Sequence, residues 1–121
     1  ALDPELPLGQ ALAFWGKFDG ADDARVNAAM AAMALTTLAY VPTAYLSTGQ
    51  RKRAVLARAI ASGAPLWLLD EPGNGLDGAS LALLRAAITG HRENGGAILF
   101  ASHFDLALSD QQSLDLAERA A

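Results

Sequence analysis

Two short apolar runs, one helix length apart, constrain the fold of this chain most strongly. Leu66–Leu69 ends at Asp70, and Ala97–Ala101 follows the turn residues Asn94–Gly96. Apolar runs of this length are too short for independent helices and are typical of strands buried on both faces. Residues 79–92 between them have helical spacing, and a strand, a crossover helix and a strand form a right-handed parallel unit. The predicted fold class is therefore α/β.

Two carboxylates, Asp70 and Glu71, come directly after the first predicted strand. Ligands of open α/β sheets bind at the carboxyl ends of strands, and adjacent carboxylates are costly to bury without a cation. Mg²⁺ would suit Asp70, usually through water, and Glu71 would then position or deprotonate a water molecule. A strand that simply emerges into solvent would also end in such a pair.

Ser47 and Gln50 have the spacing of a capping box, in which each side chain bonds the other residue's backbone N–H. A helix start of this kind attracts anions, and Gly49 would let a ligand approach the backbone closely. The cations of Arg51–Arg53 oppose the helix dipole, which favours an anionic ligand nearby. An ordinary capped helix with a solvated basic face fits the same residues.

Three helices are predicted before the first strand. The first runs from about Pro7 to Phe18, and the second begins at Asp22 and Asp23. The third runs from Thr48 to about Ser62 and stops at Gly63. The residues expected to face the core are Phe14, Trp15, Phe18, Val26, Met30, Met33, Val55, Leu56, Ala59 and Ile60.

The composition excludes several classes of protein. The 121 residues are enough for one domain, contain no cysteine, and include no apolar run near the ~20 residues that span a bilayer. No basic start followed by an apolar stretch marks a signal peptide. Residues 1–64 carry a net charge of +1 and residues 65–121 carry −5. The sequence therefore has no extended basic face, and we do not expect it to bind nucleic acid.

Four motifs in this order resemble those of the ATP-binding cassette (ABC) ATPases. Leu46–Gln50 corresponds to the family's signature Leu-Ser-Gly-Gly-Gln, with Thr48 in place of a glycine. Leu66–Glu71 corresponds to the Walker B strand, Leu76-Asp77 to the D-loop, and His103 to the switch histidine. The resemblance extends over essentially the whole chain.

The resemblance implies a role for each matched residue in the hydrolysis of ATP with Mg²⁺. Asp70 would hold the water shell of Mg²⁺, Glu71 would polarise the attacking water, and His103 would contact the γ-phosphate. Ser47 and Gly49 would bind the γ-phosphate of ATP held by a second ATP-binding subunit, so hydrolysis requires a dimer. The other matched positions at the nucleotide are Thr48, Gln50 and Asp77, with Asp77 in the dimer interface.

The Walker A pattern Gly-x-x-x-x-Gly-Lys-Ser/Thr occurs nowhere in the sequence. The chain therefore resembles the C-terminal part of a P-loop NTPase domain of the ABC type. It has a helical subdomain with the signature helix over 1–64 and a small parallel β-α-β core over 65–121. We expect this chain alone to be inactive as an ATPase, and we expect its uncovered apolar surface to promote association.

Residues 64–72 and the early run Leu12–Trp15 are most similar to the ATP-binding subunits of haem exporters in bacterial cytochrome c maturation. That resemblance implies a transmembrane permease partner and a peripheral position on the cytoplasmic face of the inner membrane. Two alternatives stay open at this point. One is an ABC ATPase of DNA repair, although neither coiled-coil heptads nor zinc cysteines occur. The other is a non-catalytic, partner-binding module. A genuine start codon at this point would support the module, and a Walker A motif in the upstream coding sequence would support the enzyme.

Overall fold

The computed structural model describes residues 2–101, and its helices and strands follow the predicted order. Helices α1 (Leu8–Phe18) and α2 (Asp23–Ala32) come first. The short 3-10 turns η1 (Thr36–Leu38) and η2 (Thr43–Tyr45) lead to helix α3 (Thr48–Ser62). Strand β1 (Leu66–Asp70), helix α4 (Gly78–Glu93) and strand β2 (Ala97–Ala101) complete the described part.

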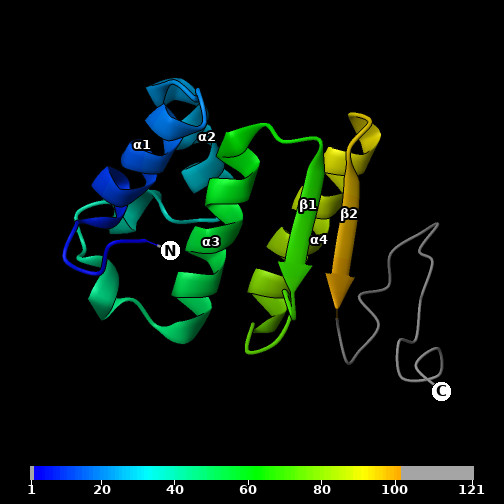
Figure 1. The fold of residues 1–121 in the computed structure, drawn as a ribbon. Coiled ribbons are helices and arrows are strands. Elements are labelled where there is room, and N and C mark those ends of the chain that lie inside the picture. Colours follow the sequence, from blue (N-terminus) through cyan, green and yellow to red (C-terminus); the bar gives the residue numbers. More distant parts are fainter. Residues whose placement is uncertain (1, 102–121) are drawn as a thin grey trace, which may run out of the picture.

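Helix α3 lies between the sheet and the helical part of the molecule, which consists of α1, α2 and the two 3-10 turns (Figure 1). It packs on α1, α2 and α4. It begins at the end of the molecule where both strands finish. The predicted boundaries of α3 are confirmed, since Ser47 caps its start and Gly63 ends it with a left-handed φ of 69°. Among the described residues, no helix is long and apolar enough to cross a membrane.

Strands β1 and β2 pair in parallel, with Leu66 opposite Ala97 and Asp70 opposite Ala101. Helix α4 connects them, so the predicted parallel β-α-β unit is confirmed. The starts of the two strands are joined by the Ala97 N–H, which donates to the Pro65 carbonyl over 2.8 Å.

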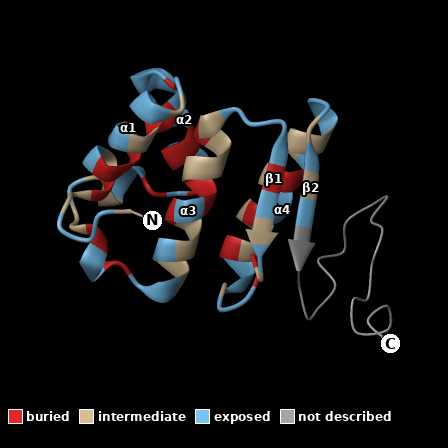
Figure 2. Ribbon diagram, viewed as in Figure 1, coloured by how far each residue is buried: buried red, intermediate tan, exposed pale blue. Residues whose placement is uncertain are grey.

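The prediction that the strands are buried on both faces is wrong. Side chains of β1 alternate, so that Trp67 is 6% exposed while Leu66 and Leu68 are 52% and 70% exposed. Leu99 of β2 shares the exposed face at 66% (Figure 2). Helix α4 contacts the sheet from the Trp67 side, and no described element packs over the opposite face. The sheet is therefore half-covered in the part of the chain described.

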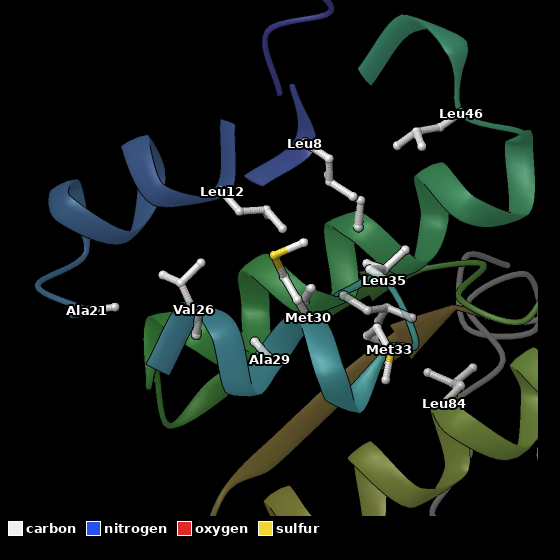
Figure 3. Packing of buried hydrophobic residues seen from close by; sticks show 14 of the residues in the cluster. Leu8, Leu12, Ala21, Val26, Ala29, Met30, Met33, Leu35, Leu46 and Leu84 are labelled. Atoms are coloured by element: carbon white, nitrogen blue, oxygen red, sulfur yellow. The ribbon is translucent and has the colours of Figure 1, made fainter. Parts of the chain in front are cut away.

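One continuous cluster of buried apolar side chains joins the helical part to α4 (Figure 3). The predicted core positions Val26, Met30 and Met33 are confirmed, and Leu84 and Ile88 enter the same cluster from α4. The buried apolar residues of α3 are Ala54, Leu56, Ala57 and Ala61.

Three residues predicted to face the core do not. Val55 is 54% exposed, and Phe14 and Phe18 are 59% and 77% exposed. Both phenylalanines pack edge-on against Trp15, at ring-centroid distances of 5.4 and 5.5 Å. The guanidinium of Arg58 lies 3.7 Å from the centroid of Trp15, so this aromatic group packs at the surface of α1 and α3 rather than in the core.

Candidate functional site

The start of α3 has the capping box that the sequence predicts. The Gln50 N–H donates to Ser47 Oγ over 3.1 Å, and the Ser47 N–H donates to Gln50 Oε1 over 2.8 Å. Ser47 and Thr48 are exposed, while Gly49 and Gln50 are half-buried. The box orders the first turn of α3 and leaves the hydroxyl-bearing residues open to solvent, as a helix start that receives an anion requires.

Gly49 lies beside the turn that follows the two carboxylates. A Cβ atom at Gly49 would lie 3.7 Å from the Gly75 carbonyl oxygen and 3.9 Å from Leu76 Cδ2, which are ordinary contacts. The packing within the described chain therefore has room for a side chain at position 49. The contact also brings the signature segment and the D-loop segment together, although they are more than 20 residues apart in sequence.

The two carboxylate residues lie at the carboxyl end of β1. Asp70 is the last residue of the strand and is exposed, and Glu71 is half-buried. Glu71 has a left-handed backbone with φ of 47°, and its carbonyl accepts from the Asn74 N–H over 3.1 Å. The chain reverses at this point, and Pro72 and Gly73, the first two residues of the turn, are buried.

The position of Asp70 suits Mg²⁺ bound through a nucleotide. Among the described residues, no three of the types His, Cys, Asp and Glu are grouped as a metal site would require. Mg²⁺ in phosphoryl-transfer sites uses one or two carboxylates, with water and substrate phosphates as the remaining ligands. A single exposed carboxylate at a strand end fits that mode of binding and does not fit an all-protein cage.

Asp77 caps helix α4. Its Oδ1 accepts from the Ser80 N–H over 2.8 Å. The hydrogen bonds from the backbone and side chain of Ser80 lower the pKa of Asp77 below its ordinary 3.8, and the nearby charge of Arg53 also lowers it. Partial desolvation opposes the shift. The ionised form is therefore the one that the folded chain favours.

We predict that Asp77→Ala lowers the urea midpoint of unfolding at pH 7, because α4 loses its cap. Because the pKa of Asp77 is lower in the folded state than in the unfolded state, its carboxylate stabilises the fold at pH values above the unfolded-state pKa near 3.8. This stabilisation is lost as the pH falls through the folded-state pKa. The difference in urea midpoint between the variant and the wild type should therefore narrow between pH 5 and pH 3. Asp77→Asn, which keeps a side-chain oxygen, serves as the control. A difference that is the same at pH 7 and pH 3 would contradict the assignment.

His103 lies outside the described residues, so its predicted place near the carboxylates stays a prediction. The sheet register sets Ala101, the last residue of β2, opposite Asp70. The backbone of the chain therefore reaches the carboxylate end of the sheet two positions before His103.

The three cations at the start of α3 make contacts within the chain that their spacing does not indicate. The side chains of Arg51, Lys52 and Arg53 all donate to backbone carbonyls, and the anionic ligand that the sequence favours there stays a prediction. Arg51 reaches Ala44 and Leu46 over 3.3 and 3.2 Å. Lys52 Nζ reaches the Glu71 carbonyl over 3.2 Å. The only sign of these carbonyl contacts in the sequence is that cations in the first turn oppose the helix dipole, so that some other contact must compensate.

Arg53 connects α3 to the end of α2. Its Nη1 donates to the carbonyls of Met33 and Ala34 over 2.9 and 3.4 Å, and its Nε is buried without a hydrogen-bond partner. Its charge also acts on Asp77. The Arg53 side chain therefore connects α3 with the end of α2 and the start of α4, which are separate in sequence.

His91 lies in the last turn of α4 and contacts the start of the sheet. Its ring stacks on Trp67, with ring centroids 3.9 Å apart and planes 12° apart. Its Nε2 lies 3.1 Å from the Pro65 carbonyl oxygen and 3.2 Å from that of Ala97. His91 thus joins the starts of both strands, at the opposite end of the sheet from the carboxylates.

Two shallow hollows in the described surface contain none of the predicted site residues. One of about 190 Å³ adjoins Phe14 and Trp15, and one of about 240 Å³ adjoins Trp67 and His91. The predicted site residues that fall within 2–101 lie instead where α3 and α4 begin and β1 ends. This arrangement suits a nucleotide whose phosphates are held mainly by other protein segments.

Comparison with known proteins agrees with the motifs. Residues 1–74 match the family described as ABC transporter. The sequence is 61% identical over 114 residues to a cytochrome c biogenesis ATP-binding export protein, CcmA, of Sphingopyxis alaskensis, covering 94% of this chain and 59% of that protein. It is 54% identical to the protein of the same name from Zymomonas mobilis, covering 96% of this chain and 52% of that protein. The chain thus spans somewhat more than half the length of these relatives.

Solved structures agree with the fold. An inward-facing ABC transporter described as of metal-chelate type matches with a TM-score of 0.65 and 26% identity, covering 85% of this chain and 45% of that one. The ATP-binding cassette of an ABC transporter in its ADP conformation matches with a TM-score of 0.57 and 20% identity, covering 69% of this chain and 34% of that one. The second match bears on the fold alone.

Proposed function

The chain belongs to the ABC transporter family, and on this premise we propose that it forms the signature and catalytic-carboxylate part of an exporter's ATP-hydrolysing subunit. The export would serve cytochrome c biogenesis, with haem as the transported substrate. The similarity to the two CcmA proteins, at 61% and 54% identity over nearly the whole chain, supports this assignment. ABC ATPases in general bind ATP with Mg²⁺, and those of ABC transporters act with membrane permease subunits.

The observation that carries the proposal is the contact between the start of α3 and the turn after β1. Gly49 lies beside Gly75 and Leu76, and Lys52 bonds the carbonyl of Glu71. Residues of the signature, Walker B and D-loop motifs are thereby gathered at one end of the molecule (Figure 1). Such convergence of distant motifs is typical of phosphoryl-transfer sites, where catalysis is mostly positioning and charge neutralisation.

Each residue has a proposed role at this end. Glu71 accepts the proton of the attacking water, and Asp70 holds Mg²⁺ through its water shell. When bound with ATP, Mg²⁺ neutralises charge on the phosphates. His103 contacts the γ-phosphate. The start of α3, with Ser47 and Gly49, binds the γ-phosphate of ATP on a second ATP-binding subunit. The other proposed contacts are Thr48 and Gln50 at the nucleotide and Asp77 at the dimer interface.

The proposal includes partners and a location. A phosphate-binding loop from a preceding segment of the same polypeptide would hold the ATP that Asp70 and Glu71 act on. The helical part over 1–64 would contact a transmembrane permease, and the subunit would sit peripherally on the cytoplasmic face of the inner membrane.

Measurements of ATP binding and hydrolysis test the proposal. The 121-residue chain alone should bind Mg-ATP negligibly by calorimetry, because a few donors at one helix start and one carboxylate cannot hold a triphosphate in water. The longer polypeptide that contains the loop Gly-x-x-x-x-Gly-Lys-Ser/Thr should bind and hydrolyse it. Micromolar affinity of the 121-residue chain, or a preceding segment without that loop, would contradict the proposal and favour a non-catalytic module.

A further inference from the structure

Two residues other than glycine have a left-handed backbone in the described part of the chain. They are Ala34, with φ of 55°, and Glu71, with φ of 47°. Residues with a Cβ atom rarely adopt this conformation, and it persists only where surrounding contacts hold it. Ala34 follows the end of α2, and Glu71 is the proposed catalytic carboxylate. The contacts that hold these two residues therefore bear on the geometry of the site.

Both residues are held by neighbouring cations on α3. Lys52 Nζ donates to the Glu71 carbonyl over 3.2 Å, and Arg53 Nη1 donates to the Ala34 carbonyl over 3.4 Å. Both cations are half-buried. A carbonyl bonded by a charged donor is held more strongly than one bonded by a neutral donor. Consecutive residues of one helix thus fix the two strained points of the backbone.

From this geometry we infer that Lys52 is a positioning residue for Glu71, and that α3 connects the helical part to the catalytic turn through Lys52 and Arg53. Lys52 holds the peptide plane of Glu71, and that plane determines the direction in which the Cα–Cβ bond of Glu71 leaves the backbone. The inference rests on the proposed role of Glu71 as the base in ATP hydrolysis.

The location of the two cations supports this role over phosphate binding. Cations in the first turns of a helix are disfavoured by the helix dipole, so another contact must compensate. Lys52 meets a carbonyl of the catalytic turn, and Arg53 keeps a buried, unpartnered Nε while it bonds the end of α2. Both head groups are engaged by the chain itself.

The test compares Lys52→Met with Lys52→Arg in the longer, ATP-hydrolysing protein. Lys52→Met should lower kcat by about ten- to a hundredfold, since small misplacement of a catalytic group has effects of this size. The KM for ATP should stay within about twofold, because the inference has Lys52 act on the backbone of Glu71 and not on ATP. Lys52→Arg should recover most of the turnover. Lys17→Met, at the chain's other lysine, which is exposed on α1, should behave as wild type.

A second readout does not depend on activity. In nucleotide-free protein, hydrogen exchange of the amides over residues 73–76 should be faster in Lys52→Met than in wild type or Lys17→Met, because the turn loses its bond to α3. In a Glu71→Gln background, Lys52→Met should cause no further loss of kcat, because Lys52 acts through Glu71.

Several outcomes would overturn the inference. A normal kcat in Lys52→Met would do so, as would a raised KM with unchanged kcat, which is the mark of a phosphate ligand. Unchanged exchange over residues 73–76 would also do so, and this readout is available even if Lys52→Met must be replaced by the milder Lys52→Gln to obtain folded protein. A wild-type protein without ATPase activity would instead refute the proposed function, while the exchange experiment would still test the contact.

Discussion

Replacing Glu71 by glutamine in the complete ATP-hydrolysing protein should slow ATP hydrolysis by about 10²- to 10⁴-fold, the contribution expected of a general base. Glutamine keeps the size and hydrogen-bonding capacity of the side chain but cannot accept the proton of the attacking water. Glu71 lies just beyond the carboxyl end of β1 on a backbone held by Lys52 and Asn74, so the substitution should leave the turn intact. ATP binding should therefore be retained in calorimetry while turnover is lost.

The same variant also tests the transported substrate. Cells whose only copy of the gene encodes Glu71→Gln should contain little haem-stained c-type cytochrome, while proteins with non-covalently bound haem are unaffected. Glu93→Gln, at an exposed carboxylate at the end of α4, is the matched control and should behave as wild type. Unchanged turnover in Glu71→Gln would remove Glu71 from the mechanism. If turnover is lost but c-type cytochromes are normal, the protein is still an ATPase that uses Glu71, but its assignment to cytochrome c biogenesis is rejected.

Leu84→Ala should lower the free energy of unfolding by about 2–5 kcal/mol, the range for a fully buried leucine whose removal leaves a cavity. Leu84 is 0% exposed and enters the buried cluster from α4 (Figure 3). It helps to join the β-α-β unit to the helical part. Urea unfolding of the 121-residue chain measures the effect.

Leu68→Ala provides the matched control on the open face of the sheet. Leu68 is 70% exposed, so the same change of side chain should cost less than about 1 kcal/mol, mainly through strand preference. Equal losses at Leu84 and Leu68 in the 121-residue chain would show that the face bearing Leu68 is covered in solution, for example by association of two chains.

Much of the local structure was predictable because it depends on residues within one helical turn or one strand. The capping box of Ser47 and Gln50 and the left-handed stop at Gly63 determine both ends of α3. The two short apolar runs and the helix between them predict a parallel pair, and the structure has it. Motif order also led to the family, because each motif is a short run of neighbouring residues.

The failures share a physical cause, which is that burial depends on what packs opposite a residue. Phe14 and Phe18 have the chemistry of core residues, but no described element lies over them, and they are exposed. Leu66 and Leu68 are as apolar as Trp67, yet only the Trp67 side of the sheet faces α4. The sequence shows the apolar periodicity of each helix or strand, but it does not show which other element packs against it in the fold.

The sequence by itself therefore determined the helices, the strands, their caps and the family, since these follow from short-range patterns of residues. Only the tertiary structure decided which face of the sheet is covered and which carbonyls the side chains of Lys52 and Arg53 bond. Those cations reach carbonyls some 20 residues away along the chain. Such contacts come from the way α3 packs between the helical part and the sheet, because packing brings together groups that no local spacing relates.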